Sequence, residues 1–129
     1  MVRVDGKGAG FTLIELIVVM AIIALLISIA APRYFAHIDR SKEAVLKQDL
    51  QVLRDAIDKY HGDKGQYPNS LDELVSSRYI RSVPVDPITE KSDTWVVVPP
   101  TDREAKGDVY DVKSGAPGQA KDGTQFSSW

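Results

Sequence analysis

The sequence predicts an α+β protein in which one long amino-terminal helix packs on a short antiparallel sheet. Between Phe11 and Ala31, 18 of 21 residues are apolar, whereas residues 33–129 hold only 34 apolar residues in 97. Apolar residues then recur mostly at three- and four-residue spacing from Ile38 to Tyr60, which is typical of an amphipathic helix. Two short runs rich in β-branched residues follow. The chain of 129 residues therefore divides into an apolar rod and a small polar domain.

The composition excludes several kinds of protein. The absence of cysteine excludes disulfide scaffolds, thiolate zinc sites and thiol nucleophiles. The formal net charge is −2 and the basic residues alternate with acidic ones, so we expect no nucleic-acid partner. No nucleophile elbow, phosphate loop or paired-histidine motif is present. His37 and His61 lie about 36 Å apart on one helix and cannot share a site. We therefore expect that the chain is not an enzyme.

The apolar segment is long enough to cross a membrane. Its 21 residues make a helix of about 31 Å, close to the thickness of a bilayer's hydrocarbon core. The leader carries Arg3, Lys7 and one acid, Asp5, so it is expected to stay cytoplasmic while the polar domain is translocated. A cleaved secretory signal ending before Ala31 is the alternative. The length of the apolar run, and a carboxylate within it at Glu15, weigh against that alternative.

Residues 10–15 read Gly-Phe-Thr-Leu-Ile-Glu after a short charged leader. This segment resembles the processing motif of type IV pilins and type II secretion pseudopilins. The resemblance implies that a prepilin peptidase cuts between Gly10 and Phe11 and methylates the new amino terminus. Glu15 then becomes the fifth residue of the mature chain. Pro32 falls where the family commonly has a helix-kinking proline.

The position of Glu15 indicates a physical role that does not depend on the family resemblance. The new amine and the carboxylate four residues later can pair between neighbouring copies in a medium of low dielectric constant. Because the rest of the segment is apolar on every side, it suits both lipid and neighbouring helices. Glu15 is therefore predicted to fix the register of assembly.

The polar domain is predicted from local signals. The helix should end near His61, before Gly62. Ser70 and Glu73 form a capping-box pattern, which predicts a short helix over residues 71–77. Strands are expected at residues 94–98 and 109–112, joined by a polar connector, with a last strand that includes Phe126. Trp95 is assigned to the sheet core, and Trp129 to a cap on the domain.

The loop and helix at residues 63–74, and Pro-Val-Asp-Pro at 84–87, resemble the major pseudopilin of type II secretion. The resemblance implies a pilin-like fold and a structural subunit of the periplasmic pseudopilus, which helps to export folded proteins. It also implies single-pass insertion in the inner membrane, with the amino terminus cytoplasmic and the carboxy-terminal domain periplasmic. The partners it implies are other copies, minor pseudopilins, prepilin peptidase, the inner-membrane assembly platform and the lipid bilayer. The segments are a leader (1–10), a membrane and filament-core helix (11–32), its amphipathic continuation (33–62) and an α/β head (63–129).

Two questions stay open at this point. Major pseudopilins bind calcium in a carboxy-terminal loop, and here Asp122, with Asp111 second, could supply carboxylate oxygens. Pro117 and flanking lysines depart from the family's pattern, and the alternative is a turn with solvated aspartates. The second question is function: a type IV pilin used in adhesion, motility or DNA uptake shares the same first residues. A periplasmic binding module that loses its apolar segment is the third possibility.

Overall fold

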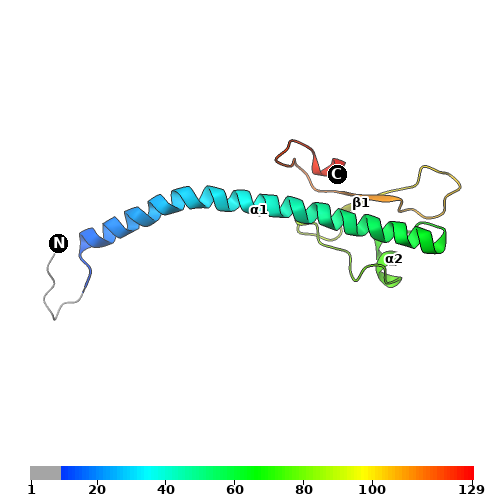
Figure 1. The fold of residues 1–129 in the computed structure, drawn as a ribbon, viewed down its shortest axis with the longest axis horizontal. Coiled ribbons are helices and arrows are strands. Elements are labelled where there is room, and N and C mark those ends of the chain that lie inside the picture. The colour runs from blue at the N-terminus through cyan, green and yellow to red at the C-terminus, as the bar shows by residue number, and fades with distance from the viewer. Residues whose placement is uncertain (1–9) are drawn as a thin grey trace. The chain divides into compact units, whose positions relative to one another are not determined.

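A computed structural model describes residues 10–129 of the chain. The leader before Gly10, where the sequence predicts a cleaved segment, lies outside the described residues. The α+β prediction is confirmed, because a long helix precedes a small antiparallel sheet (Figure 1). The elements in chain order are α1 (Leu13–Lys64), α2 (Leu71–Ser76), β1 (Trp95–Val98), β2 (Asp111–Ser114) and the 3-10 helix η1 (Phe126–Ser128).

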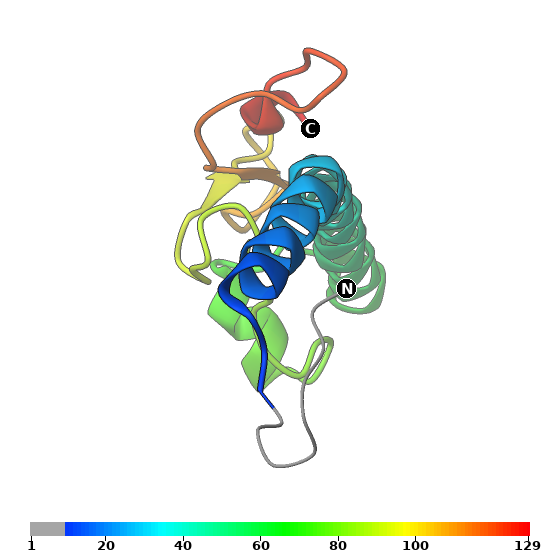
Figure 2. The same ribbon diagram turned by 90° about the vertical axis from the view of Figure 1, so that its left-hand side faces the viewer.

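The chain forms two compact units, one ending at Ile38 and the other running from Asp39 to Trp129. Within the second unit, α2 lies on one side of the later turns of α1, and the carboxy-terminal segment lies on the other side (Figures 1 and 2). The head is thus arranged around a helix rather than around a large sheet.

Helix α1 ends later than the sequence predicts. It continues through Gly62 to Lys64 instead of stopping near His61. The residue that ends it is Gly65, whose φ of 70° lies in the left-handed region that suits glycine. Its N–H donates to the carbonyl of His61 at 2.9 Å, which satisfies one of the last carbonyls of the helix. Gly62 is therefore a helical residue, and the glycine that ends the helix comes three residues later.

The core of the head is built on one stripe of α1. Leu46, Leu50, Leu53, Ile57 and Tyr60 follow three- and four-residue spacing and are at most 2% exposed. The remaining large members of the core come from α2, both strands, the segment just before β2, and η1: Leu74, Trp95, Val112, Val109 and Phe126. The amphipathic pattern in the sequence is thus confirmed as the surface on which the head packs.

Helix α2 begins at the predicted capping residue. The hydroxyl of Ser70 accepts the N–H of Glu73 at 3.2 Å. The carboxylate of Glu73 reaches back one residue further than a capping box requires, because it accepts the N–H of Asn69 at 2.7 Å. It also accepts the hydroxyl of Tyr60 at 2.5 Å. This second bond ties α2 to α1 and is invisible in the local sequence pattern. The helix ends at Ser76, with Ser77 as its carboxy-terminal cap.

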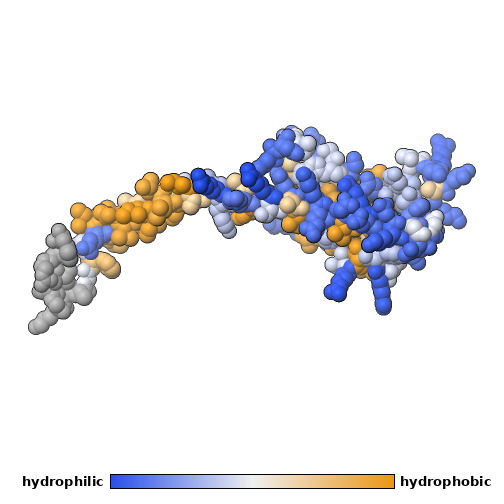
Figure 3. All heavy atoms as spheres, viewed as in Figure 1, coloured by the Kyte–Doolittle hydropathy of each residue, from blue (hydrophilic) through white to orange (hydrophobic). Residues whose placement is uncertain are grey.

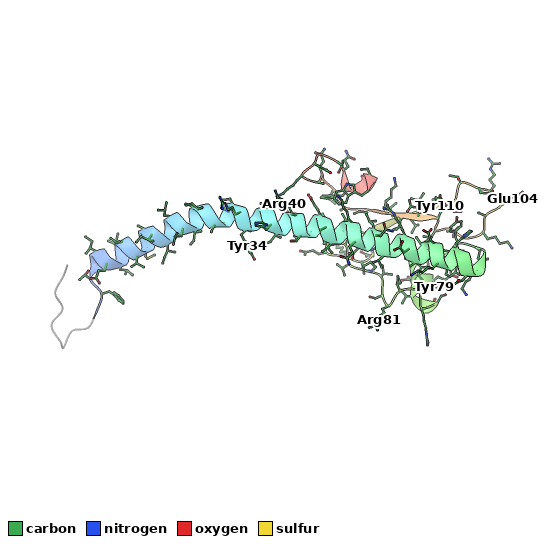
Figure 4. The ribbon with its side chains drawn as sticks, in the orientation of Figure 1. Tyr34, Arg40, Tyr79, Arg81, Glu104 and Tyr110 are labelled. Carbon is green, nitrogen blue, oxygen red and sulfur yellow. The ribbon has the colours of Figure 1, made fainter. Side chains whose placement is uncertain are left out.

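An aromatic contact also supports the junction between α1 and α2. The ring of Tyr79 meets the ring of Tyr60 edge to face, with centroids 5.4 Å apart. Its hydroxyl donates to Asp63 at 2.7 Å, near the end of α1 (Figure 4). The loop that follows α2 is thereby held against the last turns of the long helix.

The sheet has two strands, β1 and β2, paired antiparallel with Trp95 opposite Ser114 and Val98 opposite Asp111. The second strand starts two residues later than predicted, and Val109 is buried in the core just before it. The predicted last strand is wrong, because Phe126 begins a 3-10 helix. Its ring packs into the core from η1 without needing a strand. The prediction that Trp95 belongs to the core is confirmed, and its indole N–H donates to the carbonyl of Pro84 at 2.8 Å.

Asp86 ties the proline-rich segment to the sheet. Its carboxylate is fully buried, and it accepts the N–H of Ile88 at 2.8 Å and the hydroxyl of Ser114 at 2.7 Å. These bonds replace the water that a buried carboxylate loses. The segment between α2 and β1 is thus fixed by hydrogen bonds rather than by regular structure.

Asp86 also affects a carboxyl group on α1. Burial, followed by the nearby charge of Asp86, raises the pKa of the Asp49 carboxyl.

The Glu73 junction makes stability depend on pH. The hydrogen bond from Tyr60, followed by that from Asn69, lowers the pKa of Glu73 below its ordinary value. A lowered pKa adds stability above the pKa of the unfolded chain, and this stability is lost as pH falls through the folded pKa. We predict that Glu73→Gln destabilises the full chain at neutral pH. The difference from the native chain should shrink as pH falls below about 4.3.

Urea unfolding of the full chain in detergent, followed at a series of pH values, measures this difference. Glu104→Gln is the matched control, because Glu104 lies exposed in the connector between the strands (Figure 4). A Glu73→Gln effect that stays constant from neutral to acid pH would contradict the role given to the carboxylate.

Candidate functional site

The predicted processing site lies just before the long helix. Gly10 and Phe11 are exposed, and Phe11 is 87% exposed. Thr12 stops the helix from including them: its hydroxyl accepts the N–H of Glu15 at 3.2 Å, and its carbonyl accepts the N–H of Leu16 at 3.2 Å. The peptide bond between Gly10 and Phe11 is therefore outside the helix and reachable from solvent.

Sequence reasoning missed the part played by Thr12. The signal was present, since Thr12 and Glu15 have the threonine-to-glutamate spacing of a capping box. Thr12 is thus a residue that defines where the helix begins, and so where the processing motif ends.

Glu15 is half-buried in a shallow groove on the first turns of α1. The groove has a volume of about 370 Å³ and is lined by Phe11, Ile14, Glu15, Val18 and Val19. Glu15 is the only ionisable side chain between Phe11 and Pro32. No other side chain of this segment carries a charge, and an apolar groove with one acid in it suits a cationic group carried by an apolar partner.

Residues 10–129 leave the apolar turns of α1 uncovered. An 18-residue window of the helix is apolar enough to cross a membrane, and none of it is buried (Figure 3). The hydroxyl of Ser28 donates to the carbonyl of Leu25 at 2.6 Å within the same helix. This bond satisfies the polar group without water, as a lipid environment requires.

Pro32 lies inside α1, and the helix is assigned without a break on either side of it. A proline in a helix interior removes one backbone hydrogen bond. Tyr34 and Phe35 follow it, both more than 60% exposed, with their rings 5.9 Å apart. A bend at Pro32 stays a prediction.

The two predicted calcium ligands are each engaged by other groups. Asp111 accepts Nε of Arg54 at 3.0 Å and the N–H of Val112 at 2.8 Å. Asp122 accepts both the N–H and the hydroxyl of Thr124, at 2.9 and 2.6 Å. These bonds, the hydroxyl first, lower the pKa of Asp122.

The donor set around these aspartates does not fit a preformed calcium site. Calcium prefers six to eight oxygen ligands, usually with several carboxylates. Across residues 10–129, no group of three or more His, Asp or Glu side chains is placed to hold one ion. Calcium binding at Asp122 and Asp111 stays a prediction.

Within residues 10–129, the two histidines belong to no such group of metal-ligating side chains. The ring of His61 instead stacks on Tyr67, with centroids 4.1 Å apart.

Comparison with known proteins connects the amino-terminal site to a family. Residues 6–31 match the model of the prokaryotic N-terminal methylation motif. The chain is 32% identical over 95 residues to the type II secretion system core protein G of Pseudomonas aeruginosa, covering 61% of this chain and 67% of that protein. The core protein G of Escherichia coli is 29% identical over 131 residues, which cover 89% of this chain and 86% of that protein.

A pilin is also similar over the first part of the chain. The type IV major pilin protein PilA of Myxococcus xanthus is 36% identical over 72 residues, covering 56% of this chain and 33% of that pilin. No solved structure is significantly similar to the chain. The similarity to the pilin thus leaves two thirds of that protein unmatched, whereas the core protein G of Pseudomonas aeruginosa and that of Escherichia coli match over most of their length.

Proposed function

The chain belongs to the type II secretion system core protein G family, and from this premise we propose that it is a structural subunit of the pseudopilus. In this role it assembles from the inner membrane into a helical filament that helps to export folded proteins. The observation that carries the proposal is the uncovered apolar half of α1 behind a methylation motif. Such a surface needs lipid or other helices around it, and a filament subunit uses both in turn.

Processing precedes assembly in this proposal. Prepilin peptidase cuts the bond between Gly10 and Phe11, which the cap at Thr12 leaves outside the helix. Methylation then leaves a cationic amine on Phe11, at the edge of the groove that holds Glu15. The assembly platform and minor pseudopilins are further proposed partners.

The orientation in the membrane follows from charge. The leader holds two basic residues and one acid, and the positive-inside tendency keeps such a leader in the cytoplasm. The span then places the head on the periplasmic side of the inner membrane. A second copy, rather than lipid, is the final environment of the span.

The energetic role of Glu15 depends on its place in the span. An ionised carboxylate in the bilayer centre costs roughly 2.5 to 3.5 kcal/mol on insertion scales, and less near the end, where Glu15 lies. Pairing with the amine of another copy offsets that cost only in one register, because a shift of a few residues would leave both charges in an apolar environment. The pair thereby selects where each copy stops along its neighbour.

We predict that the mature protein has lost residues 1–10 and carries one extra methyl group. Intact mass spectrometry of the protein purified from membranes measures both changes at once. A new amino terminus at Ala31 would instead support the periplasmic binding module and sink the pseudopilus proposal. An uncut chain in cells that contain an active prepilin peptidase would contradict the assignment of the motif.

We predict that Glu15→Ala is cut and methylated but assembles poorly. The variant lacks the carboxylate that sets register, while the peptide bond before Phe11 is unchanged. Sheared filaments are quantified against membrane-bound subunit, with a yield at least tenfold lower than that of the native chain expected for loss of about 1.4 kcal/mol or more of pairing free energy. Ser28→Ala is the matched control, because the Ser28 hydroxyl bonds within its own helix. Normal filament yield from Glu15→Ala would refute the register role.

A further inference from the structure

One face of α1 holds the carboxy-terminal segment, residues 111–129, through polar contacts. The helix residues that make these contacts are Glu43, Lys47 and Arg54, spaced four and seven residues apart, so they project from the same side. All three lie in the second compact unit together with the segment they contact. We call this set the helix clamp.

Arg54 makes the most extensive contact of the clamp. Its Nε donates to Asp111 at 3.0 Å, and its Nη2 donates to the carbonyls of Val112 and Trp129 at 3.0 and 2.6 Å. One guanidinium therefore joins the start of β2 to Trp129, the residue that follows η1. The planar arrangement of its donors allows several such bonds from one side chain. Its side chain is 32% exposed, so water competes only in part for these bonds.

Lys47 is linked to Asp122 through a chain of contacts. Its ammonium lies 4.7 Å from the centre of the Trp129 ring. The indole N–H of Trp129 donates to the hydroxyl of Thr124 at 2.8 Å, and that hydroxyl donates to Asp122. A cation of the helix is thus connected, through Trp129 and Thr124, to the carboxylate that the sequence offers as a metal ligand.

Two other contacts close the loop without an ion. The carboxylate of Glu43 accepts the N–H of Lys121 at 2.9 Å. The N–H of Ala120 donates to the carbonyl of Thr124 at 2.8 Å, which closes the turn around Asp122. Phe126 is buried, and its ring packs edge to face on Trp129 at 5.2 Å. The turn is therefore flanked by the aromatic rings of Phe126 and Trp129 and is hydrogen-bonded to α1 through Glu43.

We propose that Arg54 and Lys47 hold Asp111 and the turn around Asp122 against α1, so that the carboxy-terminal segment folds onto the helix without bound calcium. Arg54 donates directly to Asp111, and Lys47 is linked to Asp122 through Trp129 and Thr124. The clamp belongs to the folded head of a single chain. These contacts therefore form whether or not the chain assembles into a filament. An experiment that contradicts the calcium-free folding of the segment would leave the proposed function untouched.

The first test adds calcium to the native full chain in detergent. An ion that binds only the folded state raises the melting temperature, so the melting temperature is expected to be the same in millimolar calcium and in excess EDTA. Magnesium at the same concentration controls for general salt effects. A rise with calcium that EDTA reverses would overturn the proposal.

The second test removes the cations. Lys47→Met is expected to lower the melting temperature by about 2 to 8 °C, and Arg54→Met by at least as much, since Arg54 makes three hydrogen bonds. Lys59→Met is the matched control, an exposed lysine on the same helix. Adding calcium should restore the melting temperature of neither Lys47→Met nor Arg54→Met.

Fluorescence of Trp129 gives a local measurement that does not depend on global unfolding. Loss of Lys47 should make Trp129 more accessible to the neutral quencher acrylamide, while Trp95, buried in the core, gives a constant background. Unchanged quenching and an unchanged melting temperature in Lys47→Met would overturn the proposal. So would recovery of either measurement on calcium addition.

Discussion

An apolar helical surface that the described part of the chain leaves uncovered is the constraint on which the rest of this structure depends. None of the 18-residue apolar window of α1 is buried, so its side chains must find lipid or other helices. An all-round apolar helix serves in both environments, but for the same reason it can slide along its neighbours without a preferred register. A single carboxylate in such a surface removes that freedom, because only a few positions bring a cation next to it. Glu15 is the one ionisable group available for this purpose between Phe11 and Pro32.

The head depends on the same helix for a different reason. Its sheet has two strands of four residues each, and an isolated two-stranded hairpin is at best marginally stable in water. The later turns of α1 supply the missing core through the stripe from Leu46 to Tyr60. Polar contacts then fix what the core alone would leave loose: Glu73 ties α2 to Tyr60, and Arg54 ties β2 and η1 to the helix. One continuous helix thereby carries both the assembly surface and the scaffold of the head.

Features set by local spacing were predictable from the sequence, and features set by distant contacts were not. The apolar run, the amphipathic stripe and the Ser70 cap depend on neighbours a few residues apart, and the structure has all three. The end of α1 was misplaced because Gly62 is tolerated inside a helix at a cost of about 1 kcal/mol, and Gly65 supplies the left-handed residue instead. Phe126 looked like a strand residue, yet a 3-10 turn also buries its ring. The partners of Asp111 could not be predicted, since Arg54 lies 57 residues away in the chain.

The central claim is that Glu15 of one copy pairs with the Phe11 amine of another. Electron cryo-microscopy of assembled filaments, at a resolution that shows side chains, measures the distance between these two groups directly. The pairing predicts a carboxylate oxygen within about 4 Å of the methylated amine of a neighbouring copy, in every copy along the filament. A Glu15 side chain that faces solvent, or that lies against apolar side chains with no cation near it, would contradict the claim.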